Sequence, residues 1–399
     1  MDISLFGWLA GPDGRALLAR LAAADLRESN TLALLTDLRR DLPPDVAGAA
    51  LTLARLRQRA ADKFSRADAL FFTPDALEQA SGEAVSGWRA RRFAAGGCTR
   101  IADLACSVGG DTLALAGLPG VSVVGLDRDA LRLHLARANL AAYGRGADLV
   151  QADLRDPLPL AGVPAAFFDP ARREAGRRVF SVHDYTPPLA VIERWHFRAL
   201  GVKLSPGVNL DELEPYTRAG AGVEFISHDG DLKEAVLWAG DLGFGGRWAS
   251  VLAGDGSGAT LLPQNIPAPP VDRPRAYLYE PDPAVIRAGL LGELAAELEL
   301  AMARLDESIA YLTADEAIPS RWARVWPVLD WMPFQLKRLR AALRARGVGR
   351  VTVKKRGSAI APEELIRRLK LDGDGAAAVV VLTRIAGQPG VLICGEPGT

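Results

Sequence analysis

The stretch from residue 101 to residue 173 constrains the fold most, because its short apolar runs each stop at a carboxylate or a turn. Three such runs are Ile101–Ala105, Val121–Leu126 and Ala165–Phe168. Apolar runs of this length, without alternating polar residues, are typical of parallel strands that are buried on both faces. Between the first two runs lies the small-residue loop Ser107–Gly110, which leads into a segment of helical character at Asp111–Ala116. The sequence therefore predicts a strand–turn–helix–strand unit.

The ends of these strands carry residues that are suited to a ligand. Asp103 closes the first strand, and the small residues after it allow a ligand to approach the backbone. Asp127 ends the second strand, where a carboxylate can accept hydrogen bonds from both hydroxyls of a ribose. Asp153 follows a third strand and is placed to approach an adenine ring. Asp169 follows the fourth strand, at the edge where open α/β sheets bind ligands.

The loop after the first strand distinguishes between two cofactors. A nicotinamide enzyme would share the ribose-binding acid, but its loop should read G-x-G-x-x-G, whereas this loop reads ACSVGGD. The array instead resembles class I S-adenosylmethionine-dependent methyltransferases, with DLACSVGGD in place of their glycine-rich first motif, GLDRD as the second, QADL as the third and DPAR as the fourth. Because four motifs occur in the right order and spacing, a cofactor-free α/β domain is the weaker interpretation.

The resemblance implies that S-adenosylmethionine is the cofactor and that eleven residues of these motifs bind it. These residues are Asp103, Ala105, Cys106, Ser107, Gly109, Gly110, Asp111, Asp127, Arg128, Asp153 and Leu154. The following helix N-terminus adds free N–H groups to this loop.

The resemblance also implies a catalytic role for Asp169, Pro170 and Arg172. Asp169 stands where many amino-methyltransferases keep a residue that accepts a hydrogen bond from the target nitrogen. Arg172 stands where base-amine methyltransferases carry a stacking aromatic, which argues against an exocyclic amine, and it suits a phosphate, the cofactor's carboxylate or a neighbouring acid. The 5-methyluridine methyltransferases have a similar DPPR run but need a downstream cysteine, and only Cys394 follows Asp169, so carbon-5 chemistry is disfavoured.

Composition limits the compartment and the partners. A length of 399 residues suggests about two to three domains. The formal net charge of zero means that any affinity for nucleic acid must come from local charge asymmetry. The three cysteines show no metal-ligand or disulfide spacing, and the histidines show no ligand spacing either. Because no apolar run reaches membrane-spanning length and no basic leader opens the chain, we expect a soluble cytoplasmic protein without a metal or membrane partner.

Residues 1–95 have leucines at helical spacing, so we expect a helical N-terminal region. In one interpretation this region is a helical cap whose charged residues form a solvated face. In the other, Lys63 and Phe64, with Gln79, face the cofactor cleft and contact the substrate. Residues 96–262 would form the methyltransferase domain, with a fifth strand at 200–204 and an antiparallel pair at 222–227 and 232–238. Lys203 either lies at the rim of the cleft, where it would contact substrate, or snorkels from a buried strand.

The last third of the chain changes composition after the proline-rich linker 263–275. An acidic stretch, 277–316, precedes a strongly basic one, 321–370. The segment VTVKKRGSAIAPEELIRRLKL, followed by AAAVVVLTR, is similar to the THUMP-like domain appended to a family of bacterial methyltransferases. The resemblance implies a ferredoxin-like subdomain at 276–320 and a THUMP-like domain at 321–399.

The basic turn of this domain has two interpretations. Lys354, Lys355 and Arg356 are predicted to bind an RNA backbone, although a solvated helix face is the usual explanation of a charge run. We therefore expect an α/β protein with a Rossmann-like class I methyltransferase sheet, a helical N-terminal region and a C-terminal α+β part.

The function expected from these parts is methylation of a base nitrogen in structured RNA, transfer RNA or ribosomal RNA. Two alternatives stay open. One is a small-molecule or protein methyltransferase whose last domain is structural, and the other is a non-catalytic RNA-binding protein with a relict cofactor fold. The sequence does not specify an oligomeric state.

Overall fold

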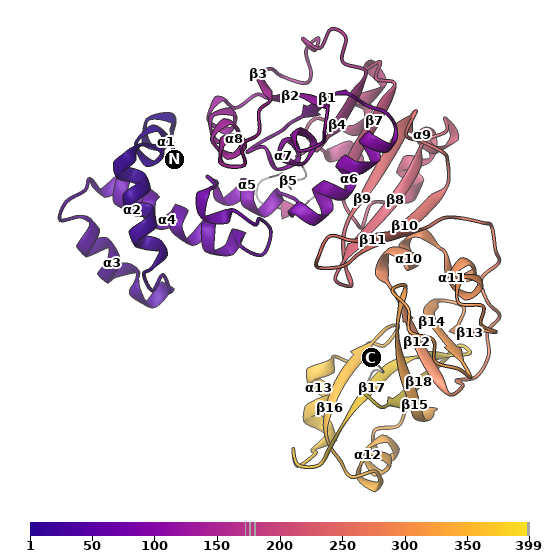
Figure 1. Ribbon diagram of the computed structural model, residues 1–399. Helices are drawn as coiled ribbons and strands as arrows, with labels where there is room; N and C mark the ends of the chain where they lie inside the picture. The colour runs from indigo at the N-terminus through magenta and orange to yellow at the C-terminus, as the bar shows by residue number, and fades with distance from the viewer. Residues whose placement is uncertain (172, 175–176, 179–180, 397–399) are drawn as a thin grey trace. The chain divides into compact units, whose positions relative to one another are not determined.

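The computed structural model describes residues 1–171, 173–174, 177–178 and 181–396 (Figure 1). The chain forms two compact units. Unit 1 consists of Met1–Val223, Glu234–Gly246 and Leu252–Ser257, and unit 2 consists of Glu224–Lys233, Arg247–Val251 and Gly258–Thr399. Within the described residues, no helix is both long enough and apolar enough to cross a membrane.

A nine-stranded sheet carries the order β11-β10-β8-β9-β7-β4-β1-β2-β3. Its strands are β1 (Arg100–Leu104), β2 (Ser122–Asp127), β3 (Asp148–Gln151), β4 (Ala165–Phe168), β7 (Ala199–Leu204), β8 (Gly222–His228), β9 (Asp231–Gly240), β10 (Arg247–Leu252) and β11 (Gly258–Leu261). The first five pair in parallel, and β9 runs antiparallel to β7. Every residue of β4 and β7 is buried, which explains their apolar sequences, and Lys203 is the charged residue among them. The predicted α/β sheet is confirmed.

The α-helices of unit 1 lie partly beside the parallel strands and partly in a separate group formed by the N-terminal part of the chain (Figure 1). They are α1 (Ile3–Ala10), α2 (Pro12–Ala22), α3 (Thr31–Leu38), α4 (Pro44–Ala60), α5 (Pro74–Gln79), α6 (Glu83–Ala95), α7 (Gly110–Ala116), α8 (Ala130–Ala142) and α9 (Glu214–Arg218). Short 3-10 helices lie at Glu28–Asn30, Ala67–Ala69, Val182–Asp184, Leu189–Arg194 and Leu210–Leu213, and β5 (Arg173–Glu174) pairs with β6 (Arg177–Arg178). The predicted helical N-terminal region therefore supplies six of the α-helices.

Unit 2 contains a seven-stranded sheet of order β13-β14-β12-β15-β18-β17-β16. Its elements are β12 (Tyr277–Pro281), α10 (Pro283–Ala288), α11 (Leu291–Glu297), β13 (Ala303–Asp306), β14 (Ile309–Ala314), β15 (Ala323–Pro333), α12 (Leu336–Ala345), β16 (Val348–Lys355), α13 (Pro362–Leu369), β17 (Ala376–Ile385) and β18 (Gln388–Cys394). Because β12 pairs with both β14 and β15, the segments 276–320 and 321–399 share one sheet.

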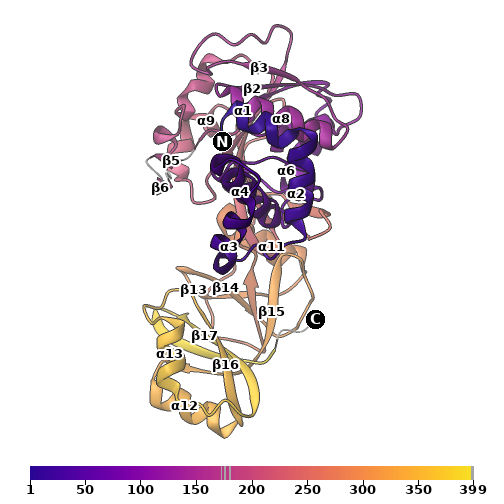
Figure 2. The ribbon, with the colours of Figure 1, turned by 90° about the vertical axis from the view of Figure 1, so that its left-hand side faces the viewer.

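The two faces of β17 belong to different cores. Val380 and Leu382 pack with residues of α12 and α13, whereas Val379 and Val381 pack with residues of β12, β13 and β14. This alternation follows from the two-residue period of a strand. Figure 2 shows α12 and α13 beside β16, where the structure packs both helices.

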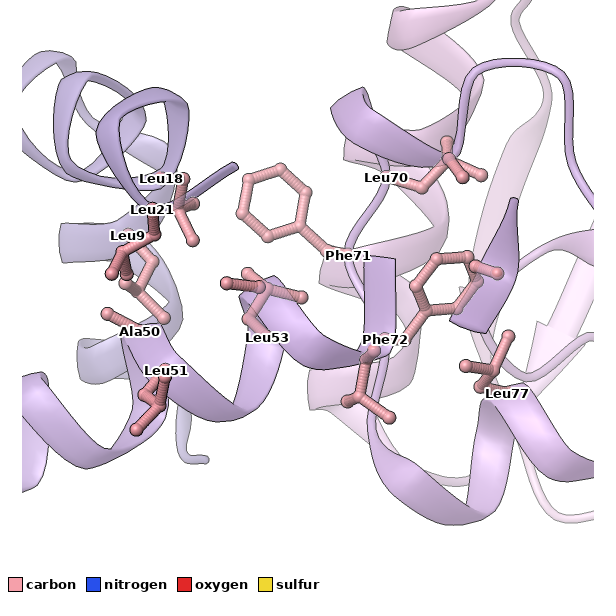
Figure 3. Close-up of a cluster of buried hydrophobic side chains, with 14 of the residues drawn as sticks. Leu9, Leu18, Leu21, Ala50, Leu51, Leu53, Leu70, Phe71, Phe72 and Leu77 are labelled. Carbon is pink, nitrogen blue, oxygen red and sulfur yellow. The ribbon is translucent and has the colours of Figure 1, made fainter. Parts of the chain in front are cut away.

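The core of the helical N-terminal region also includes Val108 and, from α8, Leu135, and the segment around Phe71 contributes to it. Figure 3 shows Phe71 extending toward Leu18 and Leu21 of α2, with Leu53 of α4 beneath it. Asn139 of α8 holds this segment in place, since its side-chain amide accepts a hydrogen bond from the N–H of Phe71 (2.8 Å) and donates to the carbonyls of Phe71 (3.0 Å) and Val108 (2.9 Å).

Replacement of Asn139 should therefore destabilise unit 1 strongly. The side chain is 1 % exposed, so Asn139→Ala leaves three backbone groups buried without partners, and we expect it to lower the free energy of unfolding by about 3 kcal/mol. Urea unfolding followed by near-UV circular dichroism measures the change. The exposed Gln58→Ala on α4 is the control, with an expected change within about 0.5 kcal/mol. Equal stability of the two variants would contradict this role for Asn139.

Candidate functional site

A cleft opens at the carboxyl ends of the parallel strands β1 to β4. Its lining includes the loop after β1, the end of β2, the segment after β3 and the turn after β4. The sequence-predicted residues that line it are Gln79, Ala105, Cys106, Ser107, Gly110, Asp111, Asp127, Arg128, Asp153, Leu154 and Asp169. The structure thus brings together most of the residues that the four motifs predicted.

The loop after β1 has an unusual backbone. Ala105 (φ 64°), Ser107 (φ 53°) and Gly109 (φ 85°) all adopt left-handed conformations. For a residue with a side chain this costs about 1–2 kcal/mol, so Ala105 and Ser107 are strained at the edge of the cleft. The N–H of Ser107 donates to Asp127 Oδ2 at 2.9 Å, which holds the loop against the end of β2. Strain of this kind is characteristic of ligand-binding segments.

Two carboxylates on one side of the cleft are held differently. Asp127 is 3 % exposed, and its Oδ1 accepts the N–H of Asp129 at 2.9 Å, with the guanidinium of Arg132 4.0 Å from Oδ2. Asp153 pairs with Arg155, whose Nε lies 2.9 Å from Asp153 Oδ1, and this hydrogen bonding holds the pKa of Asp153 well below its usual range. Both side chains are therefore fixed before any ligand binds.

On the other side of the cleft, Asp169 forms an ion pair with Lys203 of β7. The Nζ of Lys203 lies 2.7 Å from Asp169 Oδ2 and donates a second hydrogen bond to the carbonyl of Gln79 at 3.1 Å. Lys203 is 3 % exposed, whereas Asp169 is 21 % exposed. The lysine therefore comes from a buried strand and presents its ammonium group to the carboxylate that faces the cleft.

A buried arginine supports the floor of the cleft. Arg89 of α6 contacts both Asp111 and Glu234, and its guanidinium carbon lies 4.6 Å from the centroid of the Phe167 ring. Burial alone would lower the pKa of Arg89, but the two carboxylates outweigh it and raise that pKa above its ordinary value. Burial raises the pKa of Asp111, and Arg89 opposes this shift. The arginine thus supplies the positive charge that compensates these two acids.

Two other buried groups have raised pKa values. Burial, together with the nearby Asp111, raises the pKa of Asp103 well above its usual range, and Thr112 Oγ1 lies 2.5 Å from Asp103 Oδ2. Burial also raises the pKa of the Cys106 thiol well above its usual range. Cys106 is therefore a protonated, unreactive thiol at neutral pH. Asp103 is 1 % exposed, accepts its hydrogen bond from α7, and is not part of the cleft lining.

The remaining predicted residues of unit 1 occupy different environments. Gly109 precedes α7 and packs against Ala136, where an added methyl group would lie only 3.2 Å from its Cβ. Pro170 is buried, and Arg172 lies outside the described residues. Lys63 donates to the carbonyls of Leu77 and Ala80, at 2.9 Å each, and so caps the end of α5.

The predicted RNA-binding turn in unit 2 is partly engaged within the domain. Lys354 pairs with Glu280 and lies 4.5 Å from the centroid of the Trp326 ring. Arg356 lies over the ring of Tyr311 at 5.2 Å, whereas Lys355 is exposed. The side chains of Lys354 and Arg356 thus connect β16 and its turn to β12, β14 and β15.

Sequence reasoning missed Arg89 and Glu234. Glu234 lies in β9, and the two residues are 145 positions apart in the chain, so no local motif joins them. The signal that was available is the charge itself, because Glu234 interrupts an apolar strand and Arg89 lies on the buried face of α6. Among the described residues, no group of three or more His, Cys, Asp or Glu side chains is arranged to hold a metal ion.

Known proteins resemble this chain over most of its length. Residues 323–396 match the family described as THUMP domain-like, and residues 2–60 match a domain of unknown function, DUF8688. Two relatives from Mycobacterium tuberculosis, strains CDC 1551 / Oshkosh and H37Rv, are named uncharacterized S-adenosylmethionine-dependent methyltransferases. Each is 38% identical over 339 residues, which is 83% of this chain and 90% of the relative. A crystal structure from Porphyromonas gingivalis W83, assigned as a methyltransferase, is similar in fold, with a TM-score of 0.69, 22% identity and coverage of 92% of this chain and 98% of that one.

The raised pKa of Asp103 predicts a pH-dependent stability. Because the folded state binds this proton more tightly than the unfolded chain does, the stabilisation is present at low pH and is lost as pH rises through the folded pKa. The native protein should become less stable as the pH rises from about 5 to about 8. The Asp103→Asn variant cannot ionise at this position, so its free energy of unfolding should fall by at least about 1 kcal/mol less over the same range. Urea unfolding at the two pH values measures this. The exposed Asp148→Asn is the control, and identical pH profiles for all three proteins would contradict the prediction.

Proposed function

This chain belongs to the class I S-adenosylmethionine-dependent methyltransferases with a C-terminal THUMP-like domain, and we propose that it methylates a base nitrogen in structured RNA, transfer RNA or ribosomal RNA. The observation that carries the proposal is the Asp169–Lys203 ion pair at the edge of the cofactor cleft. A carboxylate held by a buried ammonium group is a hydrogen-bond acceptor suited to a nitrogen that carries a proton.

The residues of the strand-end cleft fit the cofactor. Each oxygen of Asp127 accepts one backbone N–H, and the second lone pair of each oxygen is left for a ribose hydroxyl. Ala105, Ser107 and Gly110 line the cleft with small side chains, and Asp153 lies on the side where the adenine would bind. S-adenosylmethionine supplies an electrophilic methyl group on its sulfonium sulfur, so the protein has to align the acceptor and manage its proton.

In this mechanism Asp169 accepts a hydrogen bond from the N–H of the acceptor and orients the nitrogen lone pair toward the methyl group. The bound cofactor would supply the methyl carbon, whose bond to sulfur would break as the nitrogen bonds to it, and Asp169 or water would take up the nitrogen proton. Lys203 keeps the carboxylate in place through the 2.7 Å ion pair. Gln79 in turn fixes the ammonium group, so α5 takes part in positioning the acceptor.

The state of the cysteines favours nitrogen over carbon as the acceptor. Carbon-5 methylation of a pyrimidine needs a thiolate nucleophile, as the sequence comparison with 5-methyluridine methyltransferases indicates. Burial raises the pKa of all three thiols, Cys98, Cys106 and Cys394, the last to about 12. Each cysteine is therefore a protonated thiol at neutral pH, and none is suited to that role.

The surface of α12 and α13 supports an RNA partner. Lys337 and Arg338 on α12, with Arg367 on α13 and the adjoining Lys370, are exposed, and none forms an ion pair within the part of the chain that the structure describes. Other cations of this region are already neutralised, as Arg346 is by Asp330 at 2.9 Å. We therefore assign the phosphate contacts to these four residues together with the exposed Lys355, in preference to Lys354 and Arg356.

Replacement of Asp169 should separate methyl transfer from cofactor binding. Asp169→Asn keeps the shape of the side chain but removes its charge, so we expect the transfer rate to fall by about 10² to 10⁴. The affinity for S-adenosylhomocysteine should change by less than about threefold, which is under 1 kcal/mol. The measurement is incorporation of labelled methyl groups into RNA from a strain that lacks the gene, with nucleoside analysis of the product.

The matched control is Asp148→Asn, an exposed aspartate at the start of β3 on the same sheet. It should retain the native rate. If Asp169→Asn keeps full activity, Asp169 has no role in the reaction. If the native protein binds the cofactor but labels protein or small molecules and no RNA, the acceptor class proposed here is wrong.

The salt dependence of RNA binding tests the surface of α12 and α13. Each cation that neutralises a phosphate adds about 0.7–0.9 to the slope of log K against log salt. Replacing Lys337, Arg338, Arg367 and Lys370 by glutamine should therefore reduce the slope by about 3 between about 50 and 200 mM salt. Fluorescence anisotropy with a labelled transfer RNA measures it. A variant that replaces the exposed Arg20, Arg39, Arg40 and Arg194 of unit 1 removes the same charge and should have a smaller effect. Equal slopes for the two variants would contradict the assignment.

A further inference from the structure

Unit 1 contains a second cleft, separate from the one at the strand ends. Its walls come from α2, α4, the segment between α4 and α5, and α8. Its volume of about 960 Å³ lies within the range of about 300–1,000 Å³ that is usual for small-molecule sites. Across the described residues, the two clefts have no lining residue in common. Phe64 lies between them, because it lines the second cleft and a methyl group added at Gly110 would lie 4.0 Å from its Cζ.

The second cleft is positively charged. Arg15 from α2, Arg57 from α4 and Arg66 from the following segment line it, and Asp68 is the acidic residue among the lining side chains. Three positive charges against one negative leave a net charge of +2. Within the described ranges of the chain, no carboxylate oxygen lies within 4.0 Å of a guanidinium nitrogen of these three arginines, so none of them forms an ion pair.

Two of these arginines are held in a way that leaves their terminal amino groups for a ligand. The Nε of Arg57 donates to the carbonyl of Leu70 at 2.8 Å, and its guanidinium carbon lies 5.1 Å from the centroid of the Phe71 ring. The Nε of Arg15 donates to the carbonyl of Ala10 at 2.8 Å. Burial lowers the pKa of Arg57 to about 10, so the group is still charged at neutral pH, and a bound anion would offset the cost of its burial.

The rest of the wall is apolar and made of small side chains. Ala54 of α4 and Ala138, Ala141 and Ala142 of α8 contribute to it, together with Phe71. Small side chains leave room for a flat body, and an apolar wall favours one with little charge. The cleft thus combines an anion-binding part with an apolar part.

We propose that this second cleft binds a phosphate-bearing nucleotide, either free or as one nucleotide of an RNA strand. The phosphate would lie on the guanidinium groups of Arg15, Arg57 and Arg66, because the planar fork of arginine matches phosphate oxygens and a charge of −1 to −2 balances the lining. The base would lie against the alanine-rich wall of α8. This site goes beyond methyl transfer, and it stands whichever acceptor the strand-end cleft serves.

Calorimetry on the full-length protein tests the proposal. S-adenosylhomocysteine is first added to saturation, so that the cofactor cleft cannot take up the probe. The probes are adenosine monophosphate, adenosine and a single-stranded oligoribonucleotide about five nucleotides long, which fits the site sizes of single-strand binders. We expect adenosine to bind at least tenfold more weakly than the phosphate-bearing probe that occupies the cleft.

Two variants change the cleft in independent ways. Arg15→Gln combined with Arg66→Gln removes charge at exposed positions and should weaken binding at least tenfold, whereas Arg20→Gln combined with Arg39→Gln removes the same charge elsewhere and should change it less than twofold. Ala141→Trp fills the cleft without changing its charge and should abolish binding.

Each outcome decides the proposal. Binding of adenosine monophosphate identifies a free nucleotide as the ligand, and binding of the oligonucleotide alone identifies an RNA strand. Absence of binding by both phosphate-bearing probes overturns the proposal, and so does binding that survives both the Arg15/Arg66 variant and Ala141→Trp. Methyl transfer that continues in these variants leaves the proposed function intact, so the two claims fail separately.

Discussion

The contact between Arg89 and its two carboxylate partners is the interaction on which the strand-end cleft depends. Asp103, Asp111, Asp127 and Asp169 gather at the carboxyl ends of the parallel strands, where Asp103 and Asp127 are buried and the other two are partly buried. Neighbouring carboxylates repel each other, and each buried charge without a partner raises the free energy of the folded state by several kcal/mol. Arg89 compensates Asp111 and Glu234, and Lys203 compensates Asp169, so the acids can be held close together without ligand.

The helical N-terminal region is therefore part of the site. Arg89 comes from α6, and the carbonyl of Gln79 from the end of α5 receives the ammonium group of Lys203. Lys63 caps the end of α5 and so fixes the segment that carries Gln79. The sheet alone would supply the acids at the strand ends. In this chain Arg89, from a helix that precedes the sheet, holds Asp111, and Lys203 of β7 holds Asp169 while the carbonyl of Gln79 fixes its ammonium group.

Local sequence was sufficient to predict the strands and the carboxylates at their ends, because a buried parallel strand and its terminal acid form one continuous pattern. It was not sufficient for partners that meet only in the folded chain. Glu234 is 145 residues from Arg89, and Glu280, which engages Lys354, is 74 residues before it. The sequence therefore predicted that Lys354 belongs to a basic turn that is available to bind RNA. For Lys203 the two interpretations combine, since the strand is buried and the ammonium group nevertheless reaches the edge of the cleft. The left-handed conformations of Ala105 and Ser107 were also beyond prediction, because neither residue favours them.

The central claim is that the carboxylate array and the strained loop form the cofactor site, with the Asp169–Lys203 pair at its reactive end. A crystal structure of the protein with S-adenosylhomocysteine bound tests this claim most directly. The account predicts ribose hydroxyls on Asp127, the adenine beside Asp153, the loop 105–110 around the remainder of the cofactor, and the Asp169–Lys203 ion pair intact next to the sulfur. Electron density for the cofactor elsewhere, or a bound state in which Asp169 points away from the sulfur, would contradict it.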